Sequence, residues 1–463
     1  MRHQGERAVG RKGVWSAKTP TRRSVLQRAV GSLPPIYLLL VLTSAACARA
    51  PEAQSAPAAS NTRSAQSTFR VGMTVLLQDS LQVIAGRRLG IITNHTGVDA
   101  EGVSIVDRLT QDPRAKRANV QVVRLFSPEH GIRGTEDTEN LPDMVDPKTG
   151  LMVHSLYRNG TVPPPDSLLK DLDGLVFDLS DIGTRTWTYV GVMVYGMRAA
   201  ARNNIPFIVL DRPNPLGGRM EGALLDSTLA NPDDPTPAKR GKAYALYPAP
   251  LRHGLTNGEL ARWFADELKI PVQLSVVKMG GYRRSMWWDE TGLAWVVPSP
   301  SMTSLTSALT YPTLVPFEGS NLSVGRGTPQ PFQQFGASWM DAPRVAKRLE
   351  EYGLGGVKFE AVRVTPEKPG DAKFAGKNIP MVRIVVVDRD RMQVARVGAA
   401  ILWALGREHA DSMKLNARTF DDRFGMPAAR EALLRGDDPD EIIDRLQPSI
   451  VAYQRRVKPY LLY

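Results

Sequence analysis

From Val71 onwards the first half of the chain alternates short apolar runs with amphipathic segments. Apolar runs of this length predict strands, and apolar residues spaced by three or four positions predict helices. The expected strands are 88–93, 120–126, 174–180, 206–211 and 272–277. The expected helices are 103–109 and 188–202, and a third helix begins at a Thr256/Glu259 capping box and runs through Leu268. β-Branched runs separated by helices are typical of a parallel sheet covered on both faces. The pattern therefore predicts a Rossmann-like α/β domain over residues 69–305.

The second half has a different pattern. Residues 306–340 are rich in Gly, Pro, Ser and aromatic residues and have little periodicity. We expect them to form a large structured loop over the first domain, because aromatic residues argue against disorder. A helix near 341–352, strands at 356–364 and 382–388, and helices near 392–408 and 439–446 follow. These elements predict a smaller α+β domain over residues 306–463.

The N-terminal region, residues 1–47, has the pattern of an export signal. A basic segment precedes an apolar core at 36–42 and small residues at 44–46. Residues 21–27, TRRSVLQ, resemble a twin-arginine export motif. Cys47 directly follows LTSAA, which resembles a bacterial lipobox and makes Cys47 the expected lipidation site. The alternative is ordinary signal cleavage near Ala46 or Ala48.

Residues 48–68 are rich in Ala, Ser and Pro without apolar periodicity, which predicts a disordered tether. We therefore expect an exported protein, periplasmic or in the outer envelope, which contacts the membrane only through a possible lipid anchor. Cys47 is the single cysteine, so the chain holds no internal disulfide.

The formal charge of +12 has to be weighed against its location. Residues 1–46 hold eight Lys/Arg against one acid, Glu6, so more than half of the net charge lies in the export region. The rest of the chain shows no basic stripe with interleaved aromatic residues. We therefore expect no nucleic-acid partner.

Polar side chains follow four of the predicted strands at the point where each strand ends. In a parallel sheet these carboxyl ends share one edge, where open α/β folds bind ligands. The residues concerned are Asn94 and His95 after 88–93, Glu129, His130, Arg133 and Glu136 after 120–126, Asp181, Arg185 and Tyr189 after 174–180, and Asp211 after 206–211. The sequence therefore predicts a site at this edge.

Several common kinds of site are excluded by spacing. The chain has no GxxxxGK[ST] loop, no GxSxG elbow and no HExxH motif. GRGTPQ (325–330) follows no strand and lacks the third glycine of a dinucleotide fingerprint. His95, His130 and Asp211 could be metal ligands, but they lack a metal-binding spacing, so we expect neither metal nor cofactor. The remaining carboxylates, arginines and aromatic residues are the usual equipment of a glycoside-cleaving site.

Seven stretches of the chain resemble the bacterial exo-β-N-acetylmuramidase family (NamZ type), over about residues 70–463. They are GIITNHTG, LFSPEHGIRG, LVFDLSDIGTRTWTY, VLDRPNPLGG, GLTNGELA, WVVPSPSM and YPTLVPFEGSNLSVGRGTPQPF. The resemblance implies a Rossmann-like N-terminal domain, a C-terminal α/β subdomain and an active-site cleft between them. It also implies release of terminal N-acetylmuramic acid from the non-reducing ends of peptidoglycan fragments.

We expect Glu129 to be the general acid, with His130 orienting a neighbouring group. The second catalytic group stays open: Asp181, Glu136 or Asp211 could be base or nucleophile, and Tyr189 is a further option because some glycosidases use a tyrosine. The sequence does not give the separation of the carboxylates, so retention and inversion both remain open.

Muramic acid carries a lactyl carboxylate, which a planar guanidinium fits. Arg185 and Arg326 are the first candidates to bind it, followed by Arg133. Asn94 and Asn321 could bind the N-acetyl or hydroxyl groups, and His95 and Asp211 are further substrate-binding candidates. Two other functions stay open, a non-catalytic tethered peptidoglycan-binding lipoprotein and a metal-dependent envelope hydrolase, and the sequence is silent on oligomeric state.

Overall fold

A computed structural model describes residues 69–134, 140–158, 160–230 and 245–463. All of them belong to one compact unit, Arg63–Tyr463. The export region, the tether, Cys47 and Glu136 lie outside the described residues, so the predictions made for them remain predictions.

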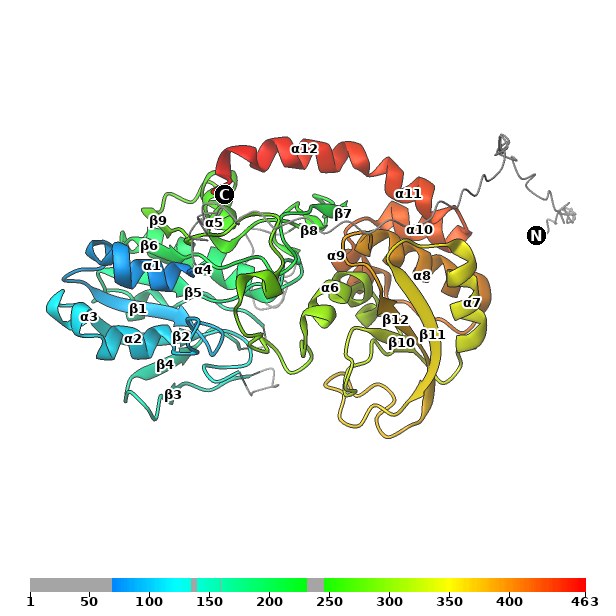
Figure 1. The fold of residues 1–463 in the computed structure, drawn as a ribbon, viewed down its shortest axis with the longest axis horizontal. Helices are drawn as coiled ribbons and strands as arrows, with labels where there is room; N and C mark the ends of the chain where they lie inside the picture. The colour runs from blue at the N-terminus through cyan, green and yellow to red at the C-terminus, as the bar shows by residue number, and fades with distance from the viewer. Residues whose placement is uncertain (1–68, 135–139, 159, 231–244) are drawn as a thin grey trace, which may run out of the picture. The chain divides into compact units, whose positions relative to one another are not determined.

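A seven-stranded sheet with the order β3-β4-β2-β1-β5-β6-β9 forms the centre of the first part (Figure 1). All neighbours pair in parallel except the edge strand β3. The strands are β1 (Arg88–Thr93), β2 (Gln121–Ser127), β3 (Met144–Val145), β4 (Met152–Ser155), β5 (Gly174–Asp178), β6 (Phe207–Leu210) and β9 (Leu274–Val277). The chain runs outward from β1 to β4, returns to β5 and then runs to β9. The strand order therefore reverses between β1 and β5, which is the usual ligand-binding position of a doubly wound sheet.

Helices cover both faces of this sheet, because successive strand residues point to opposite faces and both sets are apolar. Ile91, Val176 and Ile208 pack on the side of α1 and α2, whereas Ile92 and Phe177 pack on the side of α4 and α5. The helices are α1 (Gly72–Asp79), α2 (Ile105–Gln111), α3 (Pro113–Arg117), α4 (Thr188–Arg202) and α5 (Asn257–Glu267), with short 3₁₀ turns at Leu81–Val83, Asp166–Leu168 and Trp288–Thr291. The Thr256/Glu259 capping box is present at the start of α5. The predicted Rossmann-like fold is confirmed.

The second part is built around an antiparallel sheet with the order β10-β12-β11. Helix α8 packs against α6, α7, α10 and α11. The elements are α6 (Leu305–Leu314), the 3₁₀ turn η5 (Val315–Gly319), β10 (Gln334–Gly336), α7 (Ala342–Tyr352), β11 (Val357–Val364), β12 (Ile379–Val386), α8 (Val394–His409), α9 (Ala417–Phe424), α10 (Pro427–Arg435), α11 (Pro439–Arg445), α12 (Gln447–Val457) and η6 (Lys458–Tyr460). A two-stranded ribbon of β7 (Glu221–Leu224) and β8 (Pro250–Arg252) completes the fold. This part is the predicted smaller α+β domain.

The predicted loop over residues 306–340 contains regular elements that the sequence pattern did not indicate. They are most of α6 and all of η5 and β10, whereas residues 320–333 and 337–340 are irregular. Helix α6 starts at the Ser304 cap, whose hydroxyl accepts a hydrogen bond from Ser307 N at 3.1 Å, and it contains Pro312. All residues from Ser307 to Leu314 are buried, so the helix has no polar face and shows no period of 3.6.

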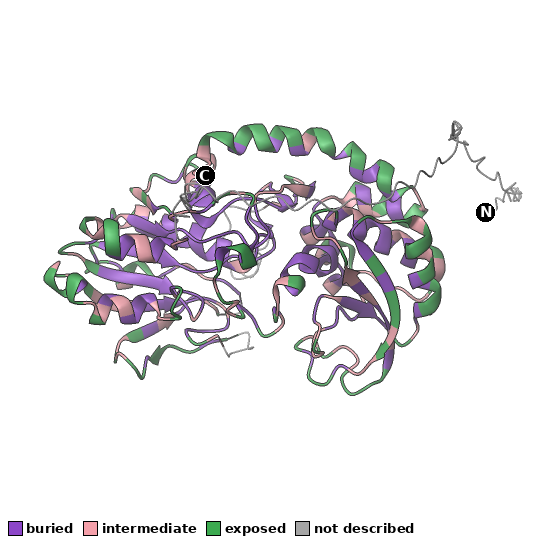
Figure 2. Ribbon diagram, viewed as in Figure 1, coloured by how far each residue is buried: buried purple, intermediate pink, exposed green. Residues whose placement is uncertain are grey.

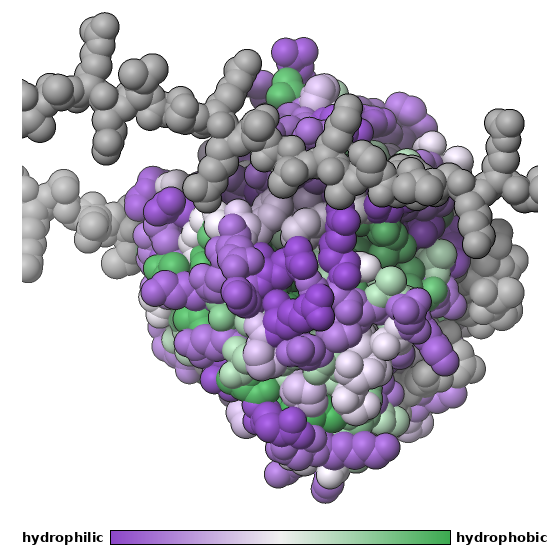
Figure 3. Space-filling model, turned by 90° about the vertical axis from the view of Figure 1, so that its right-hand side faces the viewer, coloured by the Kyte–Doolittle hydropathy of each residue, from purple (hydrophilic) through white to green (hydrophobic). Residues whose placement is uncertain are grey.

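The burial pattern matches this architecture (Figure 2): the central strands of both sheets are mostly buried, whereas β3, part of β11 and the outer side of α12 are exposed. Figure 3 shows a face on which hydrophilic side chains predominate and hydrophobic ones form smaller patches between them. Among the helices that the structure describes, none has the length and apolar character needed to cross a bilayer.

Candidate active site

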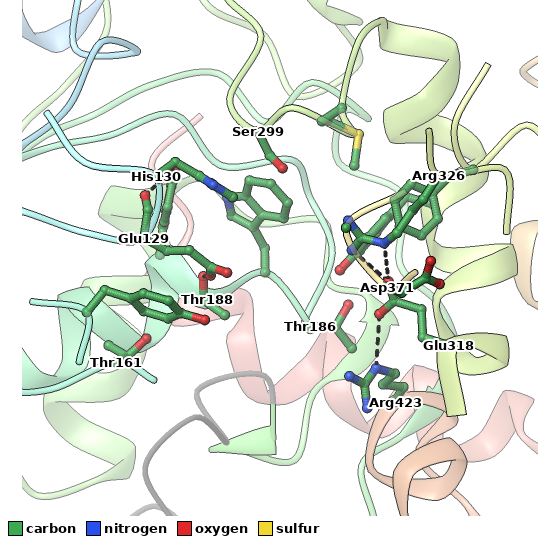
Figure 4. A pocket seen from close by; sticks show the side chains of 17 residues that line it. Glu129, His130, Thr161, Thr186, Thr188, Ser299, Glu318, Arg326, Asp371 and Arg423 are labelled. Atoms are coloured by element: carbon green, nitrogen blue, oxygen red, sulfur yellow. Dashed lines mark hydrogen bonds and ion pairs between the residues drawn. The ribbon is translucent and has the colours of Figure 1, made fainter. Parts of the chain in front are cut away.

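A cavity of about 460 Å³ lies at the carboxyl edge of the parallel sheet and is lined by residues from both parts of the chain (Figure 4). The loops after β2 and β5 supply Glu129, His130 and residues 186–189. The second part supplies residues that include Glu318, Arg326, Asp371 and Arg423. In Figure 4 Glu129, His130 and Thr188 lie opposite Glu318, Arg326, Asp371 and Arg423, whereas Thr186 lies on the side of the second set.

Glu129 stands on a tight turn directly after β2. Pro128 cannot continue the strand ladder because it has no N–H. His130 and Gly131 both have φ of 72°, and Gly131 N donates to Pro128 O at 3.1 Å. A left-handed non-glycine residue is sparsely populated and is found preferentially where a functional geometry requires it.

The Glu129 carboxylate faces the first residue of α4. Thr188 Oγ1 donates to Glu129 Oε2 at 2.9 Å. Because Thr188 begins a 15-residue helix, the positive end of the helix dipole also lies on this side of the carboxylate. The turn and the helix end together hold one glutamate oxygen in a defined position at the cavity wall.

Tyr189 is a buried hydrogen-bonding centre beside Glu129. Its hydroxyl accepts from Asn94 Nδ2 at 2.9 Å and donates to Pro298 O at 2.9 Å. Burial, with a further contribution from the Glu129 charge, raises the pKa of the Tyr189 phenol far above its usual value. The side chain therefore stays a neutral phenol, which favours a supporting role over that of a nucleophile. Asn94 is itself buried and bonded to Thr96 N, so it reaches the cavity only through Tyr189.

The opposite wall is an ion-pair network around Glu318. Arg326 approaches Glu318 Oε1 with Nη2 at 2.6 Å and Nε at 2.8 Å, and Arg423 Nε lies 3.4 Å from Oε2. Burial alone would raise the pKa of the Glu318 carboxyl, but the charges of Arg326 and Arg423 outweigh it and the pKa lies below its ordinary value. Glu318 is therefore held ionised, with both of its oxygens occupied by arginines.

Asp371 and Lys373 complete this wall. Lys373 Nζ lies 3.6 Å from Asp371 Oδ2 and donates to the carbonyls of Glu318 and Leu322 at 3.0 and 3.1 Å. Of these groups, Arg326, Arg423, Glu318 and Asp371 line the cavity, whereas Lys373 does not. The wall that faces Glu129 thus presents two guanidinium groups and two carboxylates to the cavity.

An array of aromatic rings joins the two walls. The ring centroids of Tyr189 and Trp187 are 5.3 Å apart, those of Trp187 and Tyr311 6.0 Å, and those of Tyr311 and Phe332 4.7 Å. Trp187 Nε1 and Thr161 Oγ1 are buried in this lining without a hydrogen-bond partner among the described residues. Unpaired donors beside aromatic surface suit a ligand that has both hydroxyl groups and apolar ring faces, such as a sugar.

Four of the predicted site residues line the cavity: Glu129, His130, Tyr189 and Arg326. Three others are buried elsewhere. Asp181 pairs with His253 Nε2 at 2.8 Å, Asp211 accepts from Gly258 N at 2.7 Å, and Arg185 donates to backbone carbonyls of α9. All three are buried and none lines this cavity, so their predicted roles remain predictions.

Three further candidates also lie outside the cavity. His95 Nε2 is 2.7 Å from Val297 O, and Arg133 pairs with Asp146. Asn321 bridges two backbone groups, donating to Ser412 O at 3.0 Å and accepting from Lys414 N at 2.9 Å. Each of these side chains has a local structural role.

Sequence reasoning missed Glu318, Asp371 and Arg423. Glu318 had a weak signal, because it is the single carboxylate in the apolar stretch YPTLVPFEGSNL. Arg423 had none, since RTFDDRF reads as an ordinary charged helix face. In the described ranges no cluster of three or more His, Cys, Asp or Glu could hold a metal ion.

Comparison with known proteins gives a consistent result. The chain matches the family model of the exo-beta-N-acetylmuramidase NamZ N-terminal domain over residues 89–306 and that of the C-terminal domain over residues 309–463. It is 35% identical over 414 residues to the peptidoglycan beta-N-acetylmuramidase NamZ of Bacillus subtilis, covering 89% of this chain and 95% of the relative.

Two crystal structures of DUF1343 family proteins from Bacteroides fragilis are also similar. One has a TM-score of 0.75 and 32% identity, covering 86% of this chain and 99% of the other. The second has a TM-score of 0.65 and 25% identity, covering 85% and 99%. With both domain models matched in order along the chain, the protein belongs to the exo-β-N-acetylmuramidase NamZ family.

Proposed function

We propose that the protein is a glycoside hydrolase that releases terminal N-acetylmuramic acid from the non-reducing ends of peptidoglycan fragments. The observation that carries this proposal is the cavity in which Glu129 faces an arginine-rich, carboxylate-bearing wall across an array of aromatic rings. The relative from Bacillus subtilis, named as a peptidoglycan beta-N-acetylmuramidase, supports the same substrate class.

Glu129 is the general acid in this proposal. It is the cavity carboxyl group that has no cationic partner among the described residues, and the neutral hydroxyl of Thr188 donates a hydrogen bond to it. Such a group can carry a proton and donate it to the glycosidic oxygen as the bond to the leaving sugar breaks.

The second catalytic role falls to Asp371. Glu318 also lines the cavity, but two arginines occupy its oxygens, which makes it a poor base. Its role in this proposal is to hold Arg326 and Arg423 in position. Asp371 contacts only the ammonium and backbone N–H of Lys373 among the described residues. We therefore expect Asp371→Asn to lower kcat and Glu318→Gln to raise KM.

The two arginines of this wall suggest how the site would select muramic acid. This sugar differs from N-acetylglucosamine by its lactyl group, which ends in a carboxylate. Arg326 and Arg423 present guanidinium groups on the wall that faces Glu129, and a guanidinium pairs well with a carboxylate. N-acetylglucosamine lacks this carboxylate and would not form the additional ion pair, so we expect the site to discriminate against it.

The cellular location is part of the same proposal. The signal-like segment before Cys47 and the tether after it support export and lipidation, which would place the enzyme beside its peptidoglycan substrate.

A pair of chromogenic substrates tests the proposed function. The purified protein should hydrolyse the β-glycoside of N-acetylmuramic acid and act about 100-fold less efficiently on that of N-acetylglucosamine, which lacks the carboxylate that the arginines would bind. Equal turnover of both glycosides would contradict the assignment of Arg326 and Arg423 as the groups that bind the lactyl carboxylate. Binding without turnover would instead indicate a peptidoglycan-binding protein, and loss of activity with a chelator would indicate a metal-dependent hydrolase.

A further inference from the structure

Arg185 is completely buried although it carries a charge, and it lies in the loop that joins β5 to α4. Its backbone is fixed by a hydrogen bond from Arg185 N to Leu251 O at 2.9 Å. Its side chain reaches into the second part of the chain, where Nη1 donates to Asp422 O at 3.1 Å and Nη2 donates to Arg423 O at 2.6 Å. Arg185 therefore contacts Arg423, which lines the cavity, through the Arg423 backbone carbonyl.

The position that Arg185 contacts is the carboxyl end of helix α9. The last carbonyls of a helix have no partner within the helix and carry the negative end of its dipole. Burial lowers the pKa of the Arg185 guanidinium to about 10, so it remains a cation at neutral pH and suits this position. The helix then ends at Gly425, which has φ of 107° and whose carbonyl accepts from Asp226 N at 2.8 Å.

The end of α9 carries one side of the cavity wall. Arg423 Nε lies 3.4 Å from Glu318 Oε2, and Arg423 Nη1 donates to Thr419 O at 3.1 Å. Helix α9 packs on η5, which carries Glu318, and the rings of Phe317 and Phe420 meet at 5.5 Å. A shift of the carboxyl end of α9 would therefore move Arg423 away from Glu318.

The same loop also forms the other side of the cavity. Thr186, Trp187 and Thr188 directly follow Arg185 and line the cavity, and Thr188 donates to Glu129. Residues 185–188 thus contact the Glu129 side through Thr188 and the Arg423 side through Arg185.

We infer that Arg185 is a positioning residue, which sets the distance between the lactyl-binding arginine Arg423 and the catalytic Glu129 without touching the substrate itself. This inference rests on the proposed function, because it takes the lactyl carboxylate as the ligand of the wall. A lysine cannot replace this arginine, since one ammonium group does not reproduce the planar fork that spans two carbonyls.

The experiment compares the kcat/KM ratio for the N-acetylmuramic acid and N-acetylglucosamine glycosides in the wild type and in Arg185→Lys. Misplacement of a binding group by about 1 Å can cost on the order of 100-fold, so we expect the ratio to fall by roughly 10- to 100-fold. Arg212→Lys is the matched control. Arg212 is similarly buried and forked, on Asp178, but its side chain bonds to none of the described residues that line the cavity, so the ratio should stay within about twofold of the wild type.

A double-mutant cycle separates positioning from general destabilisation. Arg423→Ala should lower the ratio by itself, and adding Arg185→Lys should then change it little, because both changes act through Arg423. Independent, additive effects of the two substitutions would overturn the inference. So would an Arg185→Lys protein that keeps the wild-type ratio. A wild type without any preference would instead overturn the proposed lactyl binding, and with it the role of Arg423.

A second variant covers the case in which Arg185→Lys does not fold. In Gly425→Ala the new Cβ would lie 3.0 Å from Leu224 O in a left-handed backbone conformation, so the end of α9 or the facing β7 backbone must give by a few tenths of an ångström. The ratio should fall in this variant as well. An unchanged ratio in Gly425→Ala would count against control of Arg423 by the end of α9.

Discussion

Asp211 offers a sharp test of whether a charged residue at the sheet edge belongs to the site or to the core. It follows β6, is completely buried and does not line the cavity. Its carboxylate accepts from Gly258 N at 2.7 Å, Thr256 Oγ1 at 2.8 Å and Tyr463 Oη at 2.8 Å. These partners join the start of α5 and the C-terminal residues to β6, which is a structural role.

The pH dependence of stability follows from the ionisation of this group. Burial raises the pKa of Asp211 to about 6 from an ordinary value of 3.8, despite the hydrogen bonds to its carboxylate. A folded-state pKa above the unfolded one contributes stability that is fully present below the unfolded pKa and is lost as the pH rises through the folded pKa. A shift of about two units corresponds to about 3 kcal/mol at 1.36 kcal/mol per unit.

The assay is urea unfolding of the wild type and of Asp211→Asn between pH 4 and pH 8. Asparagine does not titrate, so the difference in unfolding free energy between the two proteins isolates Asp211. The stability of the wild type relative to the variant should be highest near pH 4 and fall by up to about 3 kcal/mol by pH 8. A difference that is flat, or that grows with pH, would refute the reasoning. A hundredfold loss of kcat/KM in a folded Asp211→Asn protein would return Asp211 to the active site.

Three shorter predictions concern other sequence candidates. Tyr189→Phe leaves two buried partners unpaired and should cost about 1–3 kcal/mol in urea unfolding, with kcat reduced less than tenfold; a loss above a thousandfold would indicate a nucleophile. Asn321→Ala should lower the unfolding free energy by about 1–2 kcal/mol and leave KM within twofold, whereas a tenfold rise in KM would indicate substrate contact. Cys47→Ala should release the protein from the membrane fraction at full specific activity; a membrane-bound variant, with no lipid on the wild type by mass spectrometry, would exclude lipidation.

Five of the seven strands of the parallel sheet were predictable because they are continuous apolar runs, whereas the short strands β3 and β4 were not predicted. Runs such as 88–93 and 174–180 can be assigned as strands from their own residues alone. Parallel pairing then places the polar residues that follow these strands at one edge of the sheet. Glu129 could be found for this reason, since it directly follows such a run.

The rest of the site depends on tertiary contacts that a local sequence pattern does not reveal. Helix α6 is buried all round, so its residues lack the alternation that marks a helix. Arg185 has the composition of a ligand-binding arginine, but its partners are carbonyls more than 230 positions along the chain. Whether an arginine meets a substrate or a helix end is decided by tertiary packing.

Glu129→Gln tests the central claim most directly. The substrate is the disaccharide that carries N-acetylmuramic acid at its non-reducing end, and free N-acetylmuramic acid is the measured product. The wild type should release it and leave the isomeric disaccharide with terminal N-acetylglucosamine intact.

In Glu129→Gln, kcat should fall by about 10²- to 10⁴-fold with KM little changed, and the basic limb of the pH–rate profile should flatten, because the general acid is lost. Glu101→Gln, an exposed glutamate after β1, is the control and should keep full activity. A native-like Glu129→Gln protein that releases N-acetylmuramic acid at the wild-type rate would contradict the account.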